Sequence, residues 1–200
     1  MKKNMIMLIF AFTLLTAACA PMGVITVQVS RDHYKPQLEQ SKYTEYKGQW
    51  LSFDSIDVSE DPNITNFYYL SSDKTIGYTL YYTLDKMPQP VASFFWYAFQ
   101  KRFEDVGIVV KEETPLKNIP QLNLKILTLT DQEAKFRVRL LRNSVLLLEK
   151  EIIAEQKYPP TKDISELEKR QYTFIDSMAN AILNDPDFKR EFFSEKGKMN

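Results

Sequence analysis

The sequence predicts an α+β fold, a two-layer sandwich in which a mostly antiparallel sheet has two helices packed on one face. Most of the chain after residue 48 consists of short segments in which apolar and polar residues alternate, as in half-buried strands. Two longer segments, 90–106 and 163–182, carry an apolar stripe at helical spacing instead. One-sided helices must bury their stripes against another layer, and the alternating strands provide it.

Three strand-like segments open the predicted domain. Breaker residues at 59–63 and 72–74 separate them, and the segments are Gln49–Val58, Ile64–Ser71 and Thr75–Leu84. We expect the second and third to pair as a hairpin. Tyrosine favours strands and can keep its hydroxyl hydrated. We therefore interpret this pair as a half-buried sheet, with an aromatic binding face as the alternative.

The first helix is predicted to begin at Pro90, which suits a first helical turn. Its apolar stripe, rich in phenylalanine, ends at Val106, and Gly107 is a good C-terminal cap. A short strand, 108–110, follows at once. The stripe indicates packing against a sheet.

The second half of the domain is predicted to be an antiparallel meander followed by a helix. Its strands are 121–130, 134–140 and 145–155, and the middle one alternates most cleanly. Asp163 can cap the final helix, with Glu166 three residues on as in a capping box. The sequence Asn-Asp-Pro at 184–186 is predicted to end or kink that helix, and residues 187–193 could add a further turn.

The N-terminus predicts export. Lys2 and Lys3 precede an apolar run, Met5–Leu15, and small residues follow it, as in a signal peptide of residues 1–18. The run is about half of the ~20 residues that a membrane-spanning helix needs. An uncleaved membrane anchor, or a cytosolic protein with an apolar start, is the alternative.

Composition excludes several classes of protein. Removing residues 1–18 lowers Lys+Arg from 26 to 24 against 26 Asp+Glu, which leaves a net charge of −2. Such a chain lacks the basic excess of nucleic-acid-binding domains and of polybasic membrane patches. With one cysteine, no disulfide can form within the chain, and five glycines argue against a Gly-rich phosphate loop.

The sequence offers no catalytic constellation, so we expect neither an enzyme nor a metal or cofactor site. His33 is the single histidine, which excludes a two-histidine metal site and argues against a Ser-His-Asp device. Motifs for nucleophile elbows, P-loops and dinucleotides are missing. Two acidic groups remain, and we interpret both as solvated turns. One consists of Asp54, Asp57, Glu60 and Asp61, and the other of Glu112 and Glu113. For the first group, a carboxylate pair or a calcium loop is the alternative.

Residues 15–19, Leu-Thr-Ala-Ala-Cys, resemble a bacterial lipobox, with leucine one residue further from the cysteine than usual. The resemblance implies that Cys19 is the lipid attachment site and becomes the mature N-terminus. Two or three acyl chains such as palmitate would give a stable anchor. An ordinary signal-peptide cut is the alternative. By enteric-type sorting, Ala20 implies the periplasmic face of the outer membrane, with the inner membrane as the alternative.

The layout of residues 49–184 resembles small outer-membrane lipoproteins of Gram-negative bacteria, most closely the YajG-like lipoproteins. The resemblance rests on 91–110, where an apolar-x-x-Ala-aromatic helix runs into Gly107 and a short strand. Auxiliary lipoproteins of ABC-type lipid transporters and the lipopolysaccharide-assembly lipoprotein E have a comparable layered design. We accordingly expect a signal peptide (1–18), a lipidated tether (19–47), one domain (48–193) and a flexible tail (194–200). Within the tether, the β-rich residues 24–29 predict one strand that could join the sheet.

The resemblance implies a non-enzymatic accessory in envelope maintenance or in lipid or lipopolysaccharide transport. Its partners would be the membrane, through the lipid anchor, and an envelope protein complex, with no nucleic acid. One alternative is a periplasmic module that holds a lipid or glycan on the tyrosine-rich strands Phe67–Leu70 and Tyr78–Tyr82. An enzyme is the remaining alternative.

Overall fold

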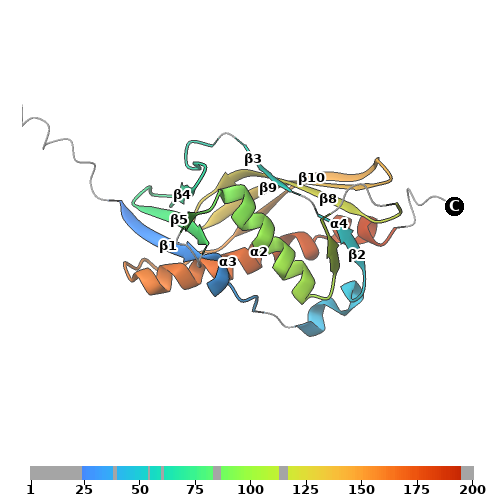
Figure 1. The fold of residues 1–200 in the computed structure, drawn as a ribbon, viewed down its shortest axis with the longest axis horizontal. Coiled ribbons are helices and arrows are strands. Elements are labelled where there is room, and N and C mark those ends of the chain that lie inside the picture. Colours follow the sequence, from blue (N-terminus) through green and yellow to red (C-terminus); the bar gives the residue numbers. More distant parts are fainter. Residues whose placement is uncertain are drawn as a thin grey trace, which may run out of the picture.

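The computed structural model describes residues 24–37, 40–53, 55–59, 61–82, 87–112 and 117–194. They form two mixed, mostly antiparallel sheets with three α-helices packed against them (Figure 1). The predicted α+β class is confirmed. The strands divide into a large and a small sheet, where the sequence had suggested a single one.

The large sheet has the strand order β10-β9-β8-β2-β7, with β3 also beside β8. Its antiparallel meander consists of β8 (Gln121–Leu129), β9 (Glu133–Arg142) and β10 (Val145–Glu155), as predicted. Three short strands pair in parallel, namely β2 (Trp50–Ser52), β3 (Ile56–Val58) and β7 (Val109–Lys111).

The predicted strand Gln49–Val58 is two strands, β2 and β3, that lie along the same neighbour. Ser52 pairs with Gln121, whereas Ile56 pairs with Leu124. The 52–56 segment therefore contains one residue more than the facing part of β8, and such an excess interrupts pairing as a bulge does.

The small sheet contains β1 (Ile25–Ser30), β4 (Tyr68–Leu70), β5 (Ile76–Tyr82) and β6 (Met87–Pro88). Strands β4 and β5 form the expected antiparallel hairpin. Strand β1 joins β5 in parallel, with Val27 opposite Tyr78. Val27 and Val29 are fully buried.

The folded body begins at β1, nearer the N-terminus than the boundary expected at residue 48. After β1 come two 3₁₀ segments, η1 (Arg31–His33) and η2 (Gln40–Tyr46). Tyr34, Tyr43 and Tyr46 of this region are buried. Their spacing in the sequence shows no helical or strand period, so their burial was not predicted. Their hydroxyls instead form hydrogen bonds with residues of the helix at 164–183.

The helices are α2 (Val91–Asp105), α3 (Ile164–Leu183) and α4 (Pro186–Phe192). Asp163 caps α3 by accepting hydrogen bonds from the backbone N–H groups of Ser165 and Glu166. Gly107 follows α2 with a φ of +94°, and a Cβ there would lie 3.1 Å from the Lys47 Cα atom. Both the left-handed backbone and the close approach require glycine.

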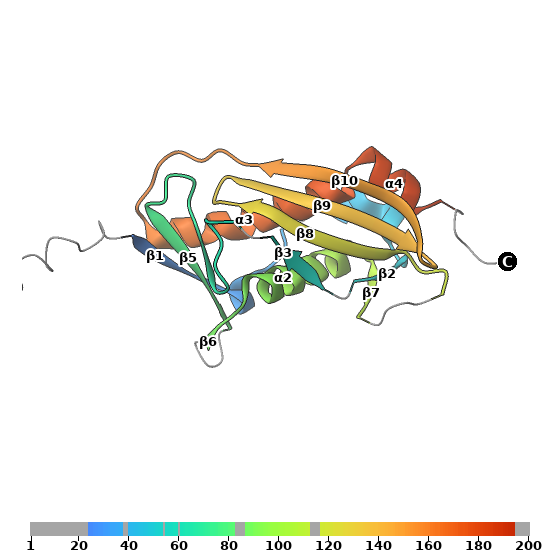
Figure 2. The ribbon, with the colours of Figure 1, turned by 90° about the horizontal axis from the view of Figure 1, so that it is seen from above.

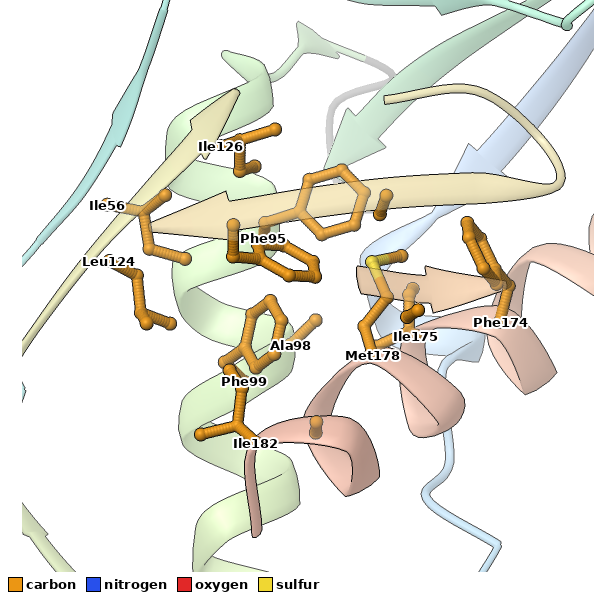
Figure 3. Close-up of a cluster of buried hydrophobic side chains, with 14 of the residues drawn as sticks. Ile56, Phe95, Ala98, Phe99, Leu124, Ile126, Phe174, Ile175, Met178 and Ile182 are labelled. Carbon is orange, nitrogen blue, oxygen red and sulfur yellow. The ribbon is translucent and has the colours of Figure 1, made fainter. Parts of the chain in front are cut away.

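The core lies where α2, α3 and the large sheet meet. Figure 2 shows the β8–β10 meander overlying α3, and α2 and α3 cross one another in Figure 1. Side chains from all three layers converge in Figure 3, including Phe99 from α2, Met178 from α3 and Ile126 from β8. Phe99 also contacts Phe136 of β9 edge to face at a centroid distance of 5.8 Å.

The other face of the meander is polar. Along β9, Phe136, Val138 and Leu140 are buried, while Arg137 and Arg139 point away from the core. The outward side chains form cross-strand ion pairs with Glu149 and Glu151 of β10. The alternation predicted for this strand is confirmed.

Candidate functional site

The predicted lipid attachment site, Cys19, lies outside the described residues. The nearest described residue is Val24, which is exposed and stands at the start of β1. Five residues of extended chain reach at most about 18 Å. A lipid on Cys19 would therefore hold the β1 end of the body within about that distance of a membrane surface.

The aromatic residues of the tyrosine-rich strands differ in burial. Tyr69 and Tyr78 are buried and stack on each other with ring centroids 5.2 Å apart and planes inclined by 19°. Phe67 and Tyr68 are exposed by 42% and 41%. At the far end of β5, the Arg31 guanidinium stacks over the Tyr82 ring, with its Cζ atom 3.6 Å from the ring centroid. The half-buried interpretation of these strands is confirmed.

A cavity of about 730 Å³ lies beside the buried tyrosine pair. It is half open to solvent and is bordered by the start of β1, the β4–β5 turn, the β8–β9 turn, the segment between β10 and α3, and the first half of α3. Its apolar lining is Ile25, Ile76, Tyr158, Pro159, Pro160 and Leu167, and its polar lining includes Asp73, Tyr78, Asp131, Lys162, Arg170 and Gln171.

Two residues of the cavity lining, Tyr78 and Gln171, belong with Tyr69 to a small buried polar group, the Gln171 cluster. The Tyr69 hydroxyl donates to Gln171 Oε1 at 2.5 Å. The Tyr78 hydroxyl is buried and forms no hydrogen bond of standard geometry within the described part of the chain. Burial, followed by the charge of Asp131, raises the pKa of Tyr78, whereas a side-chain hydrogen bond with Gln171 lowers it. This phenol therefore stays protonated.

The charged groups around the cavity are held by neighbouring parts of the chain. Asp73 accepts from the Ser71 and Thr75 hydroxyls, and these hydrogen bonds lower its pKa. Asp131 Oδ1 accepts from the Ser72 backbone at 2.9 Å. These bonds fix the β4–β5 turn against the β8–β9 turn.

Arg170 organises the opposite wall. It donates to the Pro159 carbonyl at 2.6 Å, pairs with Glu166 at 3.1 Å and lies 5.0 Å from the centre of the Tyr158 ring. The Tyr158 hydroxyl donates to the Arg170 carbonyl at 3.2 Å, and burial raises its pKa to about 12. The segment before α3 is thus bound to the helix that it leads into.

A second buried polar group, the Asp176 network, lies further along α3. Asp176 accepts from the Tyr34 hydroxyl at 2.6 Å and from the Gln37 backbone at 3.0 Å. Arg102 of α2 is fully buried, lies 3.6 Å from Asp176 and donates to Asn180 at 2.7 Å. The network ties the segment after β1 to two helices.

Sequence reasoning missed most of these residues. Gln171 and Arg102 did carry a signal, because each interrupts an otherwise apolar helical stripe, and buried polar groups require partners. Asp131, Tyr158 and Arg170 gave none, since they come from separate turns and a helix that only the fold brings together.

The other candidates are scattered. His33 is exposed and contacts Glu168 at 3.1 Å. Asp61 accepts from the Asn63 backbone at 2.7 Å in a turn, and Asp57 is exposed on β3. Asp54, Glu60 and Glu113 lie outside the described residues. Within the described residues, no group of three or more His, Cys, Asp or Glu side chains is placed to bind a metal. Across the same residues, no helix combines the length and the hydropathy needed to span a bilayer.

No family model and no curated protein matches the sequence. Solved structures of low sequence identity do match the fold. One is the crystal structure of an uncharacterized protein, 14% identical, covering 78% of this chain and 99% of that one with a TM-score of 0.41. Another is protein XCC0632 from Xanthomonas campestris, of family DUF330, 9% identical, covering 83% and 98% with a TM-score of 0.45.

Proposed function

We propose that this chain is an exported bacterial lipoprotein anchored through Cys19 to the periplasmic face of the outer membrane. It acts there as a non-enzymatic accessory in envelope maintenance or in lipid or lipopolysaccharide transport, as auxiliary lipoproteins do beside ABC-type transporters. The observation that carries the proposal is the sequence from Lys2 to Cys19, a signal peptide that ends in a lipobox-like cysteine. The folded body begins six residues later, at Ile25, as suits a domain held close to its anchor.

The state of the cavity's polar groups supports binding rather than catalysis. Burial raises the pKa of Tyr78 and brings that of Tyr158 to about 12, so both phenols remain neutral donors near pH 7. Asp73 and Arg170 are occupied by internal hydrogen bonds. A general base or nucleophile needs instead a group poised to exchange a proton.

An exposed apolar surface supports docking on a partner protein. This distal patch consists of Trp50, Val109, Val145, Leu146 and Phe193, each between 37% and 52% exposed. Trp50 and Val109 are register neighbours, and Trp50 and Phe193 line a common hollow of about 400 Å³. The strands that carry the patch lie at the end of the molecule opposite the start of β1 (Figure 1). Exposed aromatic anchors of this kind characterise protein interfaces.

The test of the anchor is Cys19→Ser in full-length protein expressed in a Gram-negative host. We expect the variant to lose incorporation of radiolabelled palmitate and to move from the membrane fraction to the soluble periplasmic fraction. Ala20→Asp is the matched control, because it keeps the acylated cysteine and should retain label while moving to the inner membrane. Unchanged membrane association of Cys19→Ser would contradict the proposal.

A second candidate function is a ligand-binding module, favoured by the cavity above the Gln171 cluster. The tyrosine-rich strands themselves do not offer an internal lipid site, because Tyr69 and Tyr78 are packed in the core. The outer face of the meander carries ion pairs such as Lys135–Glu151. Native mass spectrometry of protein extracted gently from membranes would reveal a retained ligand, and a bare polypeptide mass would count against this candidate.

A further inference from the structure

The hollow within the distal patch has walls that internal hydrogen bonds already fix. Its apolar lining consists of Trp50, Ile119, Pro120, Phe192 and Phe193. Arg142 of β9 donates to the backbone carbonyls of Phe192 and Ser194, which holds the wall at the end of α4. On another side, the Asn118 backbone and the Asn143 amide each donate to the other residue's side chain, at 3.0 and 2.9 Å. A partner side chain would therefore enter a formed hollow, with little ordering of this chain to offset its binding energy.

Three lysines flank this hollow. The Lys111 ammonium lies over the Trp50 ring, 4.9 Å from its centroid. Lys117 immediately precedes residue 118 of the lining, and Lys47 is two residues before residue 49, which also lines the hollow. All three lysines are exposed, and none has an ion-pair partner among the described residues.

Two acids near the patch are neutralised by other cations. Glu45 pairs with Lys189 at 3.0 Å, and Glu191 pairs with Arg190 at 2.9 Å. Glu112 is exposed beside one of the three lysines and balances at most one of them. Within the described residues, the surroundings of the hollow therefore keep an excess of positive charge, and such a surface favours a negatively charged partner.

The position of the patch favours a protein partner over a lipid surface. The strands that carry it lie at the end of the molecule opposite the start of β1 (Figure 1), and that start is only a few residues from Cys19. In the proposed orientation, the β1 end faces the membrane and the distal patch faces away from it. Exposed aromatic side chains that point away from the anchor are available to a partner protein.

We propose that the distal patch binds an acidic protein segment, with an apolar side chain of that segment in the hollow beside Trp50 and its carboxylates on Lys111 and Lys117. The inference rests on the proposed function, because it names the kind of partner on which the anchored body docks. The apolar side chain supplies affinity, and the charges supply orientation and a faster encounter.

The experiment measures the binding of short peptides to the full-length protein in phosphatidylcholine nanodiscs by isothermal titration calorimetry. The acidic probe has Leu-Phe at its centre and Asp-Glu on either side. One comparator replaces the centre by Ala-Ala, and another replaces both flanks by Lys-Lys. We expect the acidic probe to bind at low ionic strength and more weakly as salt is added. The Ala-Ala peptide should bind at least about tenfold more weakly, and the Lys-flanked peptide should not bind.

The charge-reversal variant Lys111→Glu/Lys117→Glu tests the residues directly. It should weaken binding of the acidic probe by about five- to tenfold, since two exposed attractions become repulsions. It should also bind the Lys-flanked peptide, a gain that a folding defect would not produce. Lys74→Glu/Lys162→Glu is the matched control, because both lysines are exposed and belong to the β4–β5 turn and the segment before α3. The control should bind the acidic probe as the native chain does.

Several results would overturn the proposal. They are failure of the acidic probe to bind, equal binding of the Ala-Ala peptide, and an unchanged affinity in the charge-reversal variant. A native chain that prefers the Lys-flanked peptide, or that co-sediments with phosphatidylglycerol vesicles but does not bind the acidic probe, would overturn it as well. Each result leaves the palmitate labelling and the fractionation of Cys19→Ser as expected, so failure here is distinguishable from failure of the anchor.

Discussion

Helix α3 carries two buried polar side chains, Gln171 and Asp176, and they differ in the parts of the fold that they connect. Asp176 uses both carboxylate oxygens to bind the segment after β1 and lies beside Arg102 of α2. Gln171 accepts a hydrogen bond from Tyr69 of β4 and lies beside Tyr78 of β5. The Asp176 network therefore ties the segment after β1 to two helices, whereas the Gln171 cluster ties the same helix to the small sheet.

The largest expected effect comes from breaking the Asp176 network. Asp176→Ala should lower the free energy of unfolding by about 3 kcal/mol, because the buried Tyr34 hydroxyl loses its acceptor and the fully buried Arg102 keeps only Asp105 as an ion-pair partner. Urea unfolding followed by circular dichroism measures the change. Glu151→Ala, which breaks only ion pairs on the outer face of the meander, is the control and should change little. A small loss in Asp176→Ala, similar to that of the control, would show that the network does not hold the fold.

The protonation of Asp176 makes the stability of the fold depend on pH. Burial raises the pKa of its carboxyl above 3.8, although the bonds from Tyr34 and Gln37 and the charge of Arg102 act in the opposite direction. The folded chain thus binds the proton more tightly than the unfolded chain. The contribution of this group to the free energy of unfolding is present below pH 3.8 and is lost as the pH rises through the folded pKa.

Asp176→Asn removes this titration. We expect the stability of the native chain, relative to this variant, to fall as the pH rises above 3.8, the unfolded pKa of an aspartate. Urea unfolding of both proteins across that range measures the difference. A relative stability that instead grows with pH would mean that Arg102 and the hydrogen bonds outweigh burial.

An intermediate effect is expected from the paired part of the Gln171 cluster. Gln171→Leu should destabilise by about 1–3 kcal/mol, because the buried Tyr69 hydroxyl loses its acceptor. Adding Tyr69→Phe removes the orphaned hydroxyl and should recover part of that loss. A double-mutant cycle with the single Tyr69→Phe variant as control measures the coupling. Strictly additive losses would contradict the hydrogen bond.

The smallest stability change is expected from Tyr78→Phe, which keeps the buried ring and removes a hydroxyl beside Gln171. The free energy of unfolding should fall by no more than about 1 kcal/mol, the net worth of one hydrogen bond. A loss larger than that of Gln171→Leu in the same urea experiment would contradict this ranking.

Local patterns predicted the regular elements of the fold. The alternation around Phe136, the stripe ending at Val106 and the cap at Asp163 each follow from a period or from a neighbouring residue, and each is confirmed. The split between β2 and β3 was missed, because it depends on how many residues face β8. The burial of Tyr34 was missed because its partner, Asp176, is 142 residues away.

The candidate site was less accessible to sequence reasoning than the fold. Polar residues on the two apolar stripes, Arg102 and Gln171, could have indicated buried networks. The cavity itself could not be anticipated, since turns at Asp73 and Asp131 meet Arg170 only after both sheets have formed. The lipid attachment site differs from the cavity in this respect. Cys19 is predicted wholly from its local sequence, and it lies outside the described residues.

Intact-mass spectrometry of the native protein, purified from the membranes of a Gram-negative host, tests the central claim most directly. Processing and acylation at Cys19 predict a polypeptide that starts at this residue and carries the added mass of two or three fatty acyl chains. A mass equal to the full chain from Met1, without fatty acid, would contradict the account.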